Sequence, residues 1–195
     1  LDAIGKDPSK IDVGISDQVG NNGFDGKSFF RVLKGETDKH RDFTYGVHTT
    51  RGVINGSETY PIRSVRSDRY KYIQNLSHEE LFYNVVTAKE AGRAGYILYE
   101  SWLENAKNEE ELSWVKHYKK RPFEEFYDLK NDPYEKNNLA QDPNYFQIKK
   151  DLEIQLKSWM QQQGDLGVET EMKAVTRQHR KGKWLSYKEK IKSKS

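Results

Sequence analysis

The chain has 195 residues, of which 34% are hydrophobic and 32% are charged, and its formal net charge is +3. This length accommodates one or two domains with a core of their own, and the charge is too small to indicate a nucleic-acid partner by itself. The lack of cysteine excludes a disulfide framework, a thiolate zinc site and a cysteine nucleophile, and no apolar run is long enough for a transmembrane helix.

The first residues predict a connecting segment and then a short helix. Residues 1–22 are rich in Gly, Asp, Ser and Asn and lack hydrophobic periodicity, so we expect no regular structure there. The next stretch, Phe24–Gly35, predicts a turn followed by a helix, because Ser28 is a suitable N-cap and Gly35 a suitable C-terminal stop.

Three strands are predicted next. In Arg41–Thr50, aromatic and aliphatic residues alternate with Thr, Gly and His, which is the pattern of a half-buried strand. Tyr60–Arg66 and Arg69–Leu76 predict a β-hairpin across a short Ser-Asp turn. Ile62 and Val65 have opposite parity in their strand, so either one of them is exposed or the strand contains a bulge.

A helical insertion is predicted to follow the hairpin. The segment Ser77–Ala91 begins with a Ser-x-x-Glu capping box, and Gly92 and Gly95 are expected to end this helix. Two further helices are predicted at Tyr96–Ala106 and Asn108–Tyr118, the second with acidic residues in its first turn.

The C-terminal third predicts a strand and a long helix. Phe123–Leu129 is rich in aromatic residues and stops at an Asn-Asp-Pro turn. Asp142 and Pro143 are a preferred N-cap and first residue for the helix that follows. Its apolar face is formed at spacings of three and four residues by Tyr145, Ile148, Leu152, Leu156 and Trp159. The predicted fold class is α+β, a small antiparallel sheet of about four strands with a long C-terminal helix packed on it and a helical insertion.

The end of the chain is basic. Residues 171–195 contain nine Lys or Arg and two Glu, a net charge of +7. This composition predicts a tail that is disordered in part. The tail could contact an anionic polymer such as nucleic acid, but a solvated terminus is the interpretation that we favour.

The end of the first predicted strand carries the strongest candidates for ligand binding. His48 is followed by Thr49, Thr50 and Arg51, where the strand runs into a glycine-containing loop, a common place for binding groups. An imidazole, hydroxyls and a guanidinium can together hold an anion or the hydroxyls of a sugar. The alternative is a polar strand end in water.

Four cations, Arg63, Arg66, Arg69 and Lys71, cluster on the predicted hairpin. They would attract an anionic ligand, or they form an exposed strand edge that resists aggregation. The histidines lack the spacing of a metal site, and the acidic turn after the fourth strand lacks the pattern of a calcium loop. We therefore predict no metal site and no catalytic residue in this chain.

Three stretches resemble, in the expected order, motifs of the sulfatase family. Asp25–Glu36 resembles its D-G-x-S-F…L-x-G segment, Ser64–Ile73 its R-T-D-R-Y-K-Y-I strand pair, and Phe126–Ala140 its E-L-Y-D-L-x-x-D-P-x-E-x-x-N-L-A motif. The resemblance covers roughly residues 23–163. Tyr60–Leu76, followed by a helical insertion, is similar to the N-sulfoglucosamine sulfohydrolases (heparan sulfamidases) and related bacterial sulfatases.

The resemblance implies an enzyme of two parts. A large N-terminal α/β domain carries a calcium ion and a formylglycine made from the first residue of a Cys/Ser-x-Pro-x-Arg motif. A smaller C-terminal subdomain is a four-stranded antiparallel sheet with a long helix. Neither Cys nor Ser stands two residues before any proline of this chain, so the nucleophile motif is absent. The chain resembles only the second part.

From this resemblance we expect residues 1–22 to connect to a missing catalytic domain, 23–165 to form the C-terminal subdomain, and 166–195 to form the basic tail. The intact enzyme would hydrolyse a sulfate ester or sulfamate of a sulfated glycan, and this fragment alone would be inactive. Calcium and formylglycine would belong to the missing domain, with no cofactor in this fragment. The expected partners are that domain and the glycan, with no membrane and no nucleic acid, in the periplasm or outside the cell.

The expected role of the chain is to form one wall of the enzyme's substrate pocket and to bind the sugar. The expected substrate-binding residues are His48, Thr50, Arg51, Arg63 and Arg66. A stand-alone binding module for an acidic polymer such as heparin or nucleic acid is the alternative, and a purely structural domain is a third interpretation.

Overall fold

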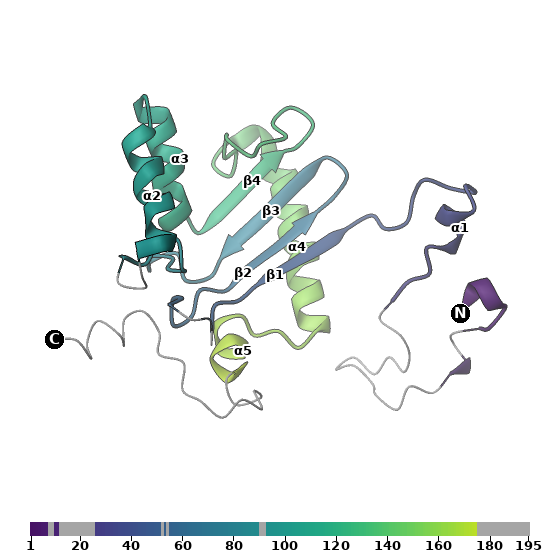
Figure 1. The fold of residues 1–195 in the computed structure, drawn as a ribbon. Helices are drawn as coiled ribbons and strands as arrows, with labels where there is room; N and C mark the ends of the chain where they lie inside the picture. Colours follow the sequence, from purple (N-terminus) through teal and green to yellow (C-terminus); the bar gives the residue numbers. More distant parts are fainter. Residues whose placement is uncertain (8–9, 12–25, 52, 54, 90–92, 175–195) are drawn as a thin grey trace.

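A four-stranded sheet and a long helix form the centre of the molecule (Figure 1). The structure, a computed structural model, describes residues 1–7, 10–11, 26–51, 53, 55–89 and 93–174. Most of the predicted connecting segment and most of the predicted basic tail lie outside the described residues. The short helix Asp2–Ile4 contradicts the expectation of no regular structure at the start of that segment. In chain order, the elements are η1 (Asp2–Ile4), α1 (Phe30–Leu33), β1 (Thr44–His48), β2 (Ile62–Arg66), β3 (Tyr70–Asn75), α2 (Arg93–Asn105), α3 (Glu109–Lys119), β4 (Glu124–Asp128), η4 (Pro143–Tyr145), α4 (Phe146–Gln162) and α5 (Val168–Lys173).

The strands pair in chain order, β1-β2-β3-β4, and every pair is antiparallel. One row of partners crosses the sheet through Tyr45, Val65, Tyr72 and Phe126. Because directly paired residues project from the same face, these side chains lie together, and the last three are completely buried. The predicted antiparallel sheet is confirmed, and this row is the centre of its core.

Helix α4 covers this face of the sheet. Its Leu152 and Leu156 are buried in the core cluster, and Trp159 stacks on Tyr45 with 4.7 Å between ring centroids. The chain enters the helix through η4, where the Asp142 carboxylate accepts a hydrogen bond from the backbone N–H two residues on. The predicted start signal and apolar face of the long helix are confirmed, and with them the α+β fold class.

The opposite face of the sheet is more polar. One of its rows contains Ser64, Ile73 and Glu125, of which only the glutamate is buried. Ile62, two residues from Ser64, points to the same face and is half-buried. Because the pairing of β2 is continuous, the opposite parity of its apolar residues reflects two faces and not a bulge.

The segment after β4 returns along the outer edge of that strand. The Asn138 amide donates to the Glu124 carbonyl (3.1 Å) and accepts from the Phe126 N–H (2.9 Å) and the Ala140 N–H (3.0 Å). The Leu139 N–H donates to the Phe126 carbonyl at 2.8 Å. These bonds satisfy backbone groups that an edge strand would otherwise expose.

The helices α2 and α3 form the predicted insertion beside one end of the sheet, next to β4 in Figure 1. Asn108 caps α3, because its side chain accepts from the Glu111 N–H at 2.9 Å. The Lys119 carbonyl at the other end of α3 accepts from the Phe82 N–H at 2.8 Å. Both helices were predicted from the sequence and are confirmed.

The prediction of a helix at Ser77–Ala91 is wrong, because the described residues there form turns and irregular backbone. Side chains satisfy the backbone groups that a helix would have bonded. The Asn84 amide oxygen accepts from the N–H groups of Val86 (2.9 Å) and Thr87 (3.1 Å), and the Thr87 hydroxyl donates to the Phe82 carbonyl (3.1 Å). Asn and Thr compete with helix formation in this way.

Gly95 was expected to break a helix, but it lies inside α2. A Cβ at this position would stand 2.1 Å from the carbonyl oxygen of Val85. The glycine therefore lets α2 approach the preceding turn closely, which is a packing role and not a terminating one.

The core predicts a sharp difference between two residues of α4. Leu156 is completely buried, whereas Ile154 is 53% exposed. We expect Leu156→Ala to lower the free energy of unfolding by about 2–5 kcal/mol because it leaves a cavity, and Ile154→Ala to cost about 1 kcal/mol or less. Urea unfolding followed by tryptophan fluorescence measures both, and equal losses would contradict this packing.

Candidate functional site

The loop after β1 closes around a carboxylate from the far end of the chain. Oε1 of Glu171, in α5, accepts from the N–H groups of Thr50 (2.8 Å), Arg51 (3.1 Å) and Tyr60 (3.1 Å). It also accepts from the Thr50 hydroxyl at 3.2 Å. Glu171 and Thr50 are each only 2% exposed, so this contact ties α5 firmly to the β1–β2 loop.

The hydroxyl of Thr50 is therefore already engaged within the chain. Arg51 differs, because its guanidinium is partly exposed and donates to the Glu58 carboxylate at 2.8 Å. An exposed pair of this kind contributes little to stability and can exchange one partner for another. Of the two, only Arg51 offers a side chain for binding.

The His48 ring lies against Phe82, with 5.5 Å between ring centroids. Partial burial lowers the pKa of His48 below its usual value, and the positive charges of Arg121 and Arg63 lower this pKa further, while Glu171 opposes them. The imidazole is thus neutral at pH 7. A neutral imidazole can both donate and accept a hydrogen bond, as a sugar hydroxyl can.

Arg63 lies on the α4 face of the sheet and is 2% exposed. Its guanidinium pairs with the Asp165 carboxylate and donates to the His48 carbonyl (3.1 Å). Burial raises the pKa of Asp165, but the hydrogen bonds from the Arg63 guanidinium and the Gly167 N–H, with the positive charge of Arg63, together lower this pKa below its usual value. Arg63 therefore joins β1, β2 and the segment after α4.

Arg66 is exposed at the other end of β2, where it pairs with Thr44 of β1 and Lys71 of β3. The structure thus brings His48, Thr50, Arg51 and Arg63 together at one end of the sheet and places Arg66 at the opposite end. The assignment of these residues to substrate binding stays a prediction.

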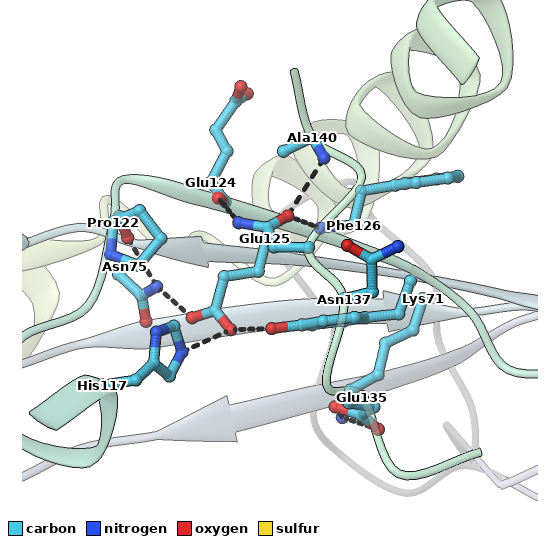
Figure 2. Close-up of polar contacts among 12 residues, drawn as sticks. Lys71, Asn75, His117, Pro122, Glu124, Glu125, Phe126, Glu135, Asn137 and Ala140 are labelled. Carbon is cyan, nitrogen blue, oxygen red and sulfur yellow. Dashed lines mark hydrogen bonds and ion pairs between the residues drawn. The ribbon is translucent and has the colours of Figure 1, made fainter. Parts of the chain in front are cut away.

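A second polar cluster, which the sequence did not indicate, surrounds Glu125 on the face opposite α4 (Figure 2). This carboxylate is 5% exposed. It accepts from the Asn75 amide (2.7 Å) and the Tyr127 hydroxyl (2.6 Å), and it lies 3.1 Å from His117 Nε2. Burial favours the protonated acid, but the bonds from His117, Tyr127 and Asn75 together lower the pKa of Glu125 to about 2.

Among the described residues, no group of three or more His, Cys, Asp or Glu side chains is arranged to hold a metal ion. No helix in the described part of the chain has the length and apolar character needed to cross a bilayer.

The known proteins that this chain resembles in sequence are all named as sulfatases or sulphohydrolases. The chain is 37% identical over 142 residues to an ulvan-active sulfatase of Formosa agariphila, covering 73% of this chain and 25% of that protein. It is 29% identical over 106 residues to the human N-sulphoglucosamine sulphohydrolase, covering 52% of this chain and 20% of that enzyme. The chain belongs to the sulfatase family. The resemblance found in the three sequence motifs is thereby confirmed, and the family is one of hydrolases.

This sulfatase-family chain spans a quarter or less of the length of these relatives. No protein-family model matches it. Among solved structures, a 2-O GAG sulfatase aligns with a TM-score of 0.41 and 22% identity, over 72% of this chain and 21% of that structure.

The contact between Glu171 and the loop predicts a large effect on stability. Glu171→Ala leaves three backbone N–H groups, two of them buried, without their acceptor, so we expect the free energy of unfolding to fall by about 3 kcal/mol. Glu169, on the same helix, is exposed and pairs with Lys173, and we expect Glu169→Ala to cost about 0.5 kcal/mol or less. Urea unfolding at pH 7 compares the two, and similar losses would rule out the proposed tie.

Glu125 predicts a specific dependence of stability on pH. Its pKa is about 2 in the folded chain against 4.5 for the unfolded group, so its contribution is complete above about pH 5 and is lost as the pH falls towards 2. This contribution is about 3 kcal/mol. We expect the difference in unfolding free energy between the wild type and Glu125→Gln to shrink by that amount from pH 6 to pH 2. A constant difference would show that Glu125 does not titrate in this way.

Proposed function

We propose that this chain is the C-terminal subdomain of a sulfatase that hydrolyses a sulfate ester or sulfamate on a sulfated glycan. The observation that carries the proposal is the match to an ulvan-active sulfatase over 73% of this chain but only 25% of the relative. The sequence also lacks the Cys/Ser-x-Pro-x-Arg motif. The chain then contributes structure and binding groups, and the nucleophile comes from another part of the enzyme.

The catalytic domain that this proposal requires is the partner of the present chain. That domain would carry the formylglycine and the calcium ion, which supply the nucleophile and a positive charge opposite the sulfate oxygens. The end of the sheet near the β1–β2 loop, on the face opposite α4, suits the contact, because His48 there is exposed and Ile62 is half-buried. Packing the domains there would leave α4 on the outside.

The geometry assigns different roles to the five proposed binding residues. His48 and Arg51 have side chains that can reach a ligand, as a neutral imidazole and a partly exposed guanidinium. Thr50 and Arg63 support them, because both are buried and bonded within the chain. Arg66, at the other end of β2, would meet a more distant part of the glycan.

The names of the relatives support the substrate class. One acts on ulvan and another is named for N-sulphoglucosamine, so we propose a sulfated glycan without choosing between a sulfate ester and a sulfamate. A periplasmic or secreted location accompanies this proposal.

Two measurements test the proposal. The coding sequence upstream of Leu1 is expected to encode an α/β domain with a Cys/Ser-x-Pro-x-Arg motif. The purified 195-residue chain is expected to release no sulfate from an aryl sulfate or a sulfated disaccharide. Turnover by this chain alone, or a coding sequence that begins at Leu1, would refute the assignment.

A further inference from the structure

A cleft of about 470 Å³ lies between α3 and the turn that follows β4. The residues important for its chemistry are Trp114 and His117 of α3, Tyr127 of β4, and Tyr134, Lys136 and Asn138 of the turn. The cleft is far from the β1–β2 loop, because three strand spacings, about 14 Å, separate β4 from β1.

Buried Glu125 fixes one side of the cleft. The Tyr127 hydroxyl donates to this carboxylate, and His117 Nε2 lies 3.1 Å from it (Figure 2). Both side chains line the cleft, and their positions are set by a group that is itself 5% exposed. Polar groups held in place by buried partners are typical of a built binding site.

Aromatic rings form the other sides. Tyr134 is 81% exposed, and Trp114 also lines the cleft. Lys136 Nζ lies 4.2 Å from the centroid of the Trp114 ring and 6.0 Å from that of Tyr134. The cleft therefore combines flat apolar rings with a cation in direct contact with them.

The turn that carries Tyr134 and Lys136 contains a residue with a left-handed backbone conformation. Glu135, between them, has a φ of 55°, which is unfavourable for a residue with a side chain. Lys71 of β3 holds it, because Nζ contacts both carboxylate oxygens of Glu135 at 2.8 and 2.7 Å (Figure 2). This pair neutralises the Glu135 carboxylate, and Lys136 places a positive charge beside the Trp114 ring.

A further positive charge lies beyond the cleft, on the face of the sheet opposite α4. Tyr127 pairs with Lys71, and Lys71 pairs with Arg66, so the three residues form one row across β4, β3 and β2. Arg66 is exposed at the end of this row. An extended anionic ligand in the cleft would continue over Arg66.

We propose that this cleft is a second binding subsite for an anionic sugar unit of an oligosaccharide. The apolar face of a pyranose stacks on Trp114 and Tyr134, His117 bonds one of its hydroxyls, and Lys136 pairs with its sulfate or carboxylate. The choice of a sulfated sugar as the occupant rests on the proposed function, and the position of Lys136 beside the Trp114 ring supports an anionic substituent independently.

The test measures binding and not turnover. Calorimetry titrates the 195-residue chain with a size-defined sulfated heparin hexasaccharide and with the same hexasaccharide after desulfation. We expect Trp114→Ala to weaken binding of the sulfated probe about tenfold and Trp114→Phe to retain most of it. We expect Lys136→Gln to weaken binding several-fold and to reduce its dependence on salt.

Matched controls lie on α4, outside the cleft. Phe146 is 62% exposed, and Lys150 pairs with Glu153 on the surface. We expect Phe146→Ala and Lys150→Gln to leave the dissociation constant unchanged. Circular dichroism verifies that each variant is folded.

Several results would overturn the proposal. These are equal binding by Trp114→Ala and Phe146→Ala, equal binding of the sulfated and desulfated probes, or binding that disappears only when residues 175–195 are removed. Dimerisation lost on Trp114→Ala would assign the cleft to a second copy of the chain. This experiment measures binding and not turnover, so a failure of the cleft to bind the probe leaves the sulfatase assignment intact. Conversely, an upstream sequence without the nucleophile motif would refute the sulfatase assignment but leave binding in the cleft intact.

Discussion

A single helix can cover only one face of a sheet, and most of this structure follows from that constraint. The row Tyr45, Val65, Tyr72 and Phe126 lies under α4 and forms the core. Polar side chains are consequently concentrated on the other face, where His48 lies in the edge strand β1 and Glu125 in the edge strand β4. The two proposed binding regions, the β1–β2 loop and the cleft beside α3, are thus linked by one polar surface of the sheet.

Three buried charges are stabilised in the same way, by several hydrogen bonds each. Glu125 is bonded by side chains, Glu171 mainly by backbone N–H groups, and Arg63 by a carboxylate and two carbonyls. Removing a charge from water is costly, so each of these residues requires a complete set of partners. This requirement explains why their partners come from distant segments: Thr50 and Glu171 are 121 residues apart.

The sequence predicts those parts of the structure whose causes are local. Strand alternation, the Asp142 cap and the apolar spacing of α4 are visible within a few residues, and each was confirmed. The turns at 77–91 and the place of Gly95 inside α2 depend on contacts between segments. The local pattern therefore gave two wrong predictions, a helix at 77–91 and a helix break at Gly95. For the candidate site, His48 to Arg51 were recognisable as a strand end, but their closure by Glu171 and the cluster around Glu125 have no sequence spacing that reveals them.

The position of Asn138 has a consequence for assembly. Its side chain bonds the backbone of Glu124 and Phe126 in β4 much as a neighbouring strand would. An extended segment of another molecule therefore finds these backbone groups of β4 already occupied, which protects the sheet from edge-to-edge aggregation on that side. Among the described residues, β1 at the opposite edge is the strand that remains open to strand addition.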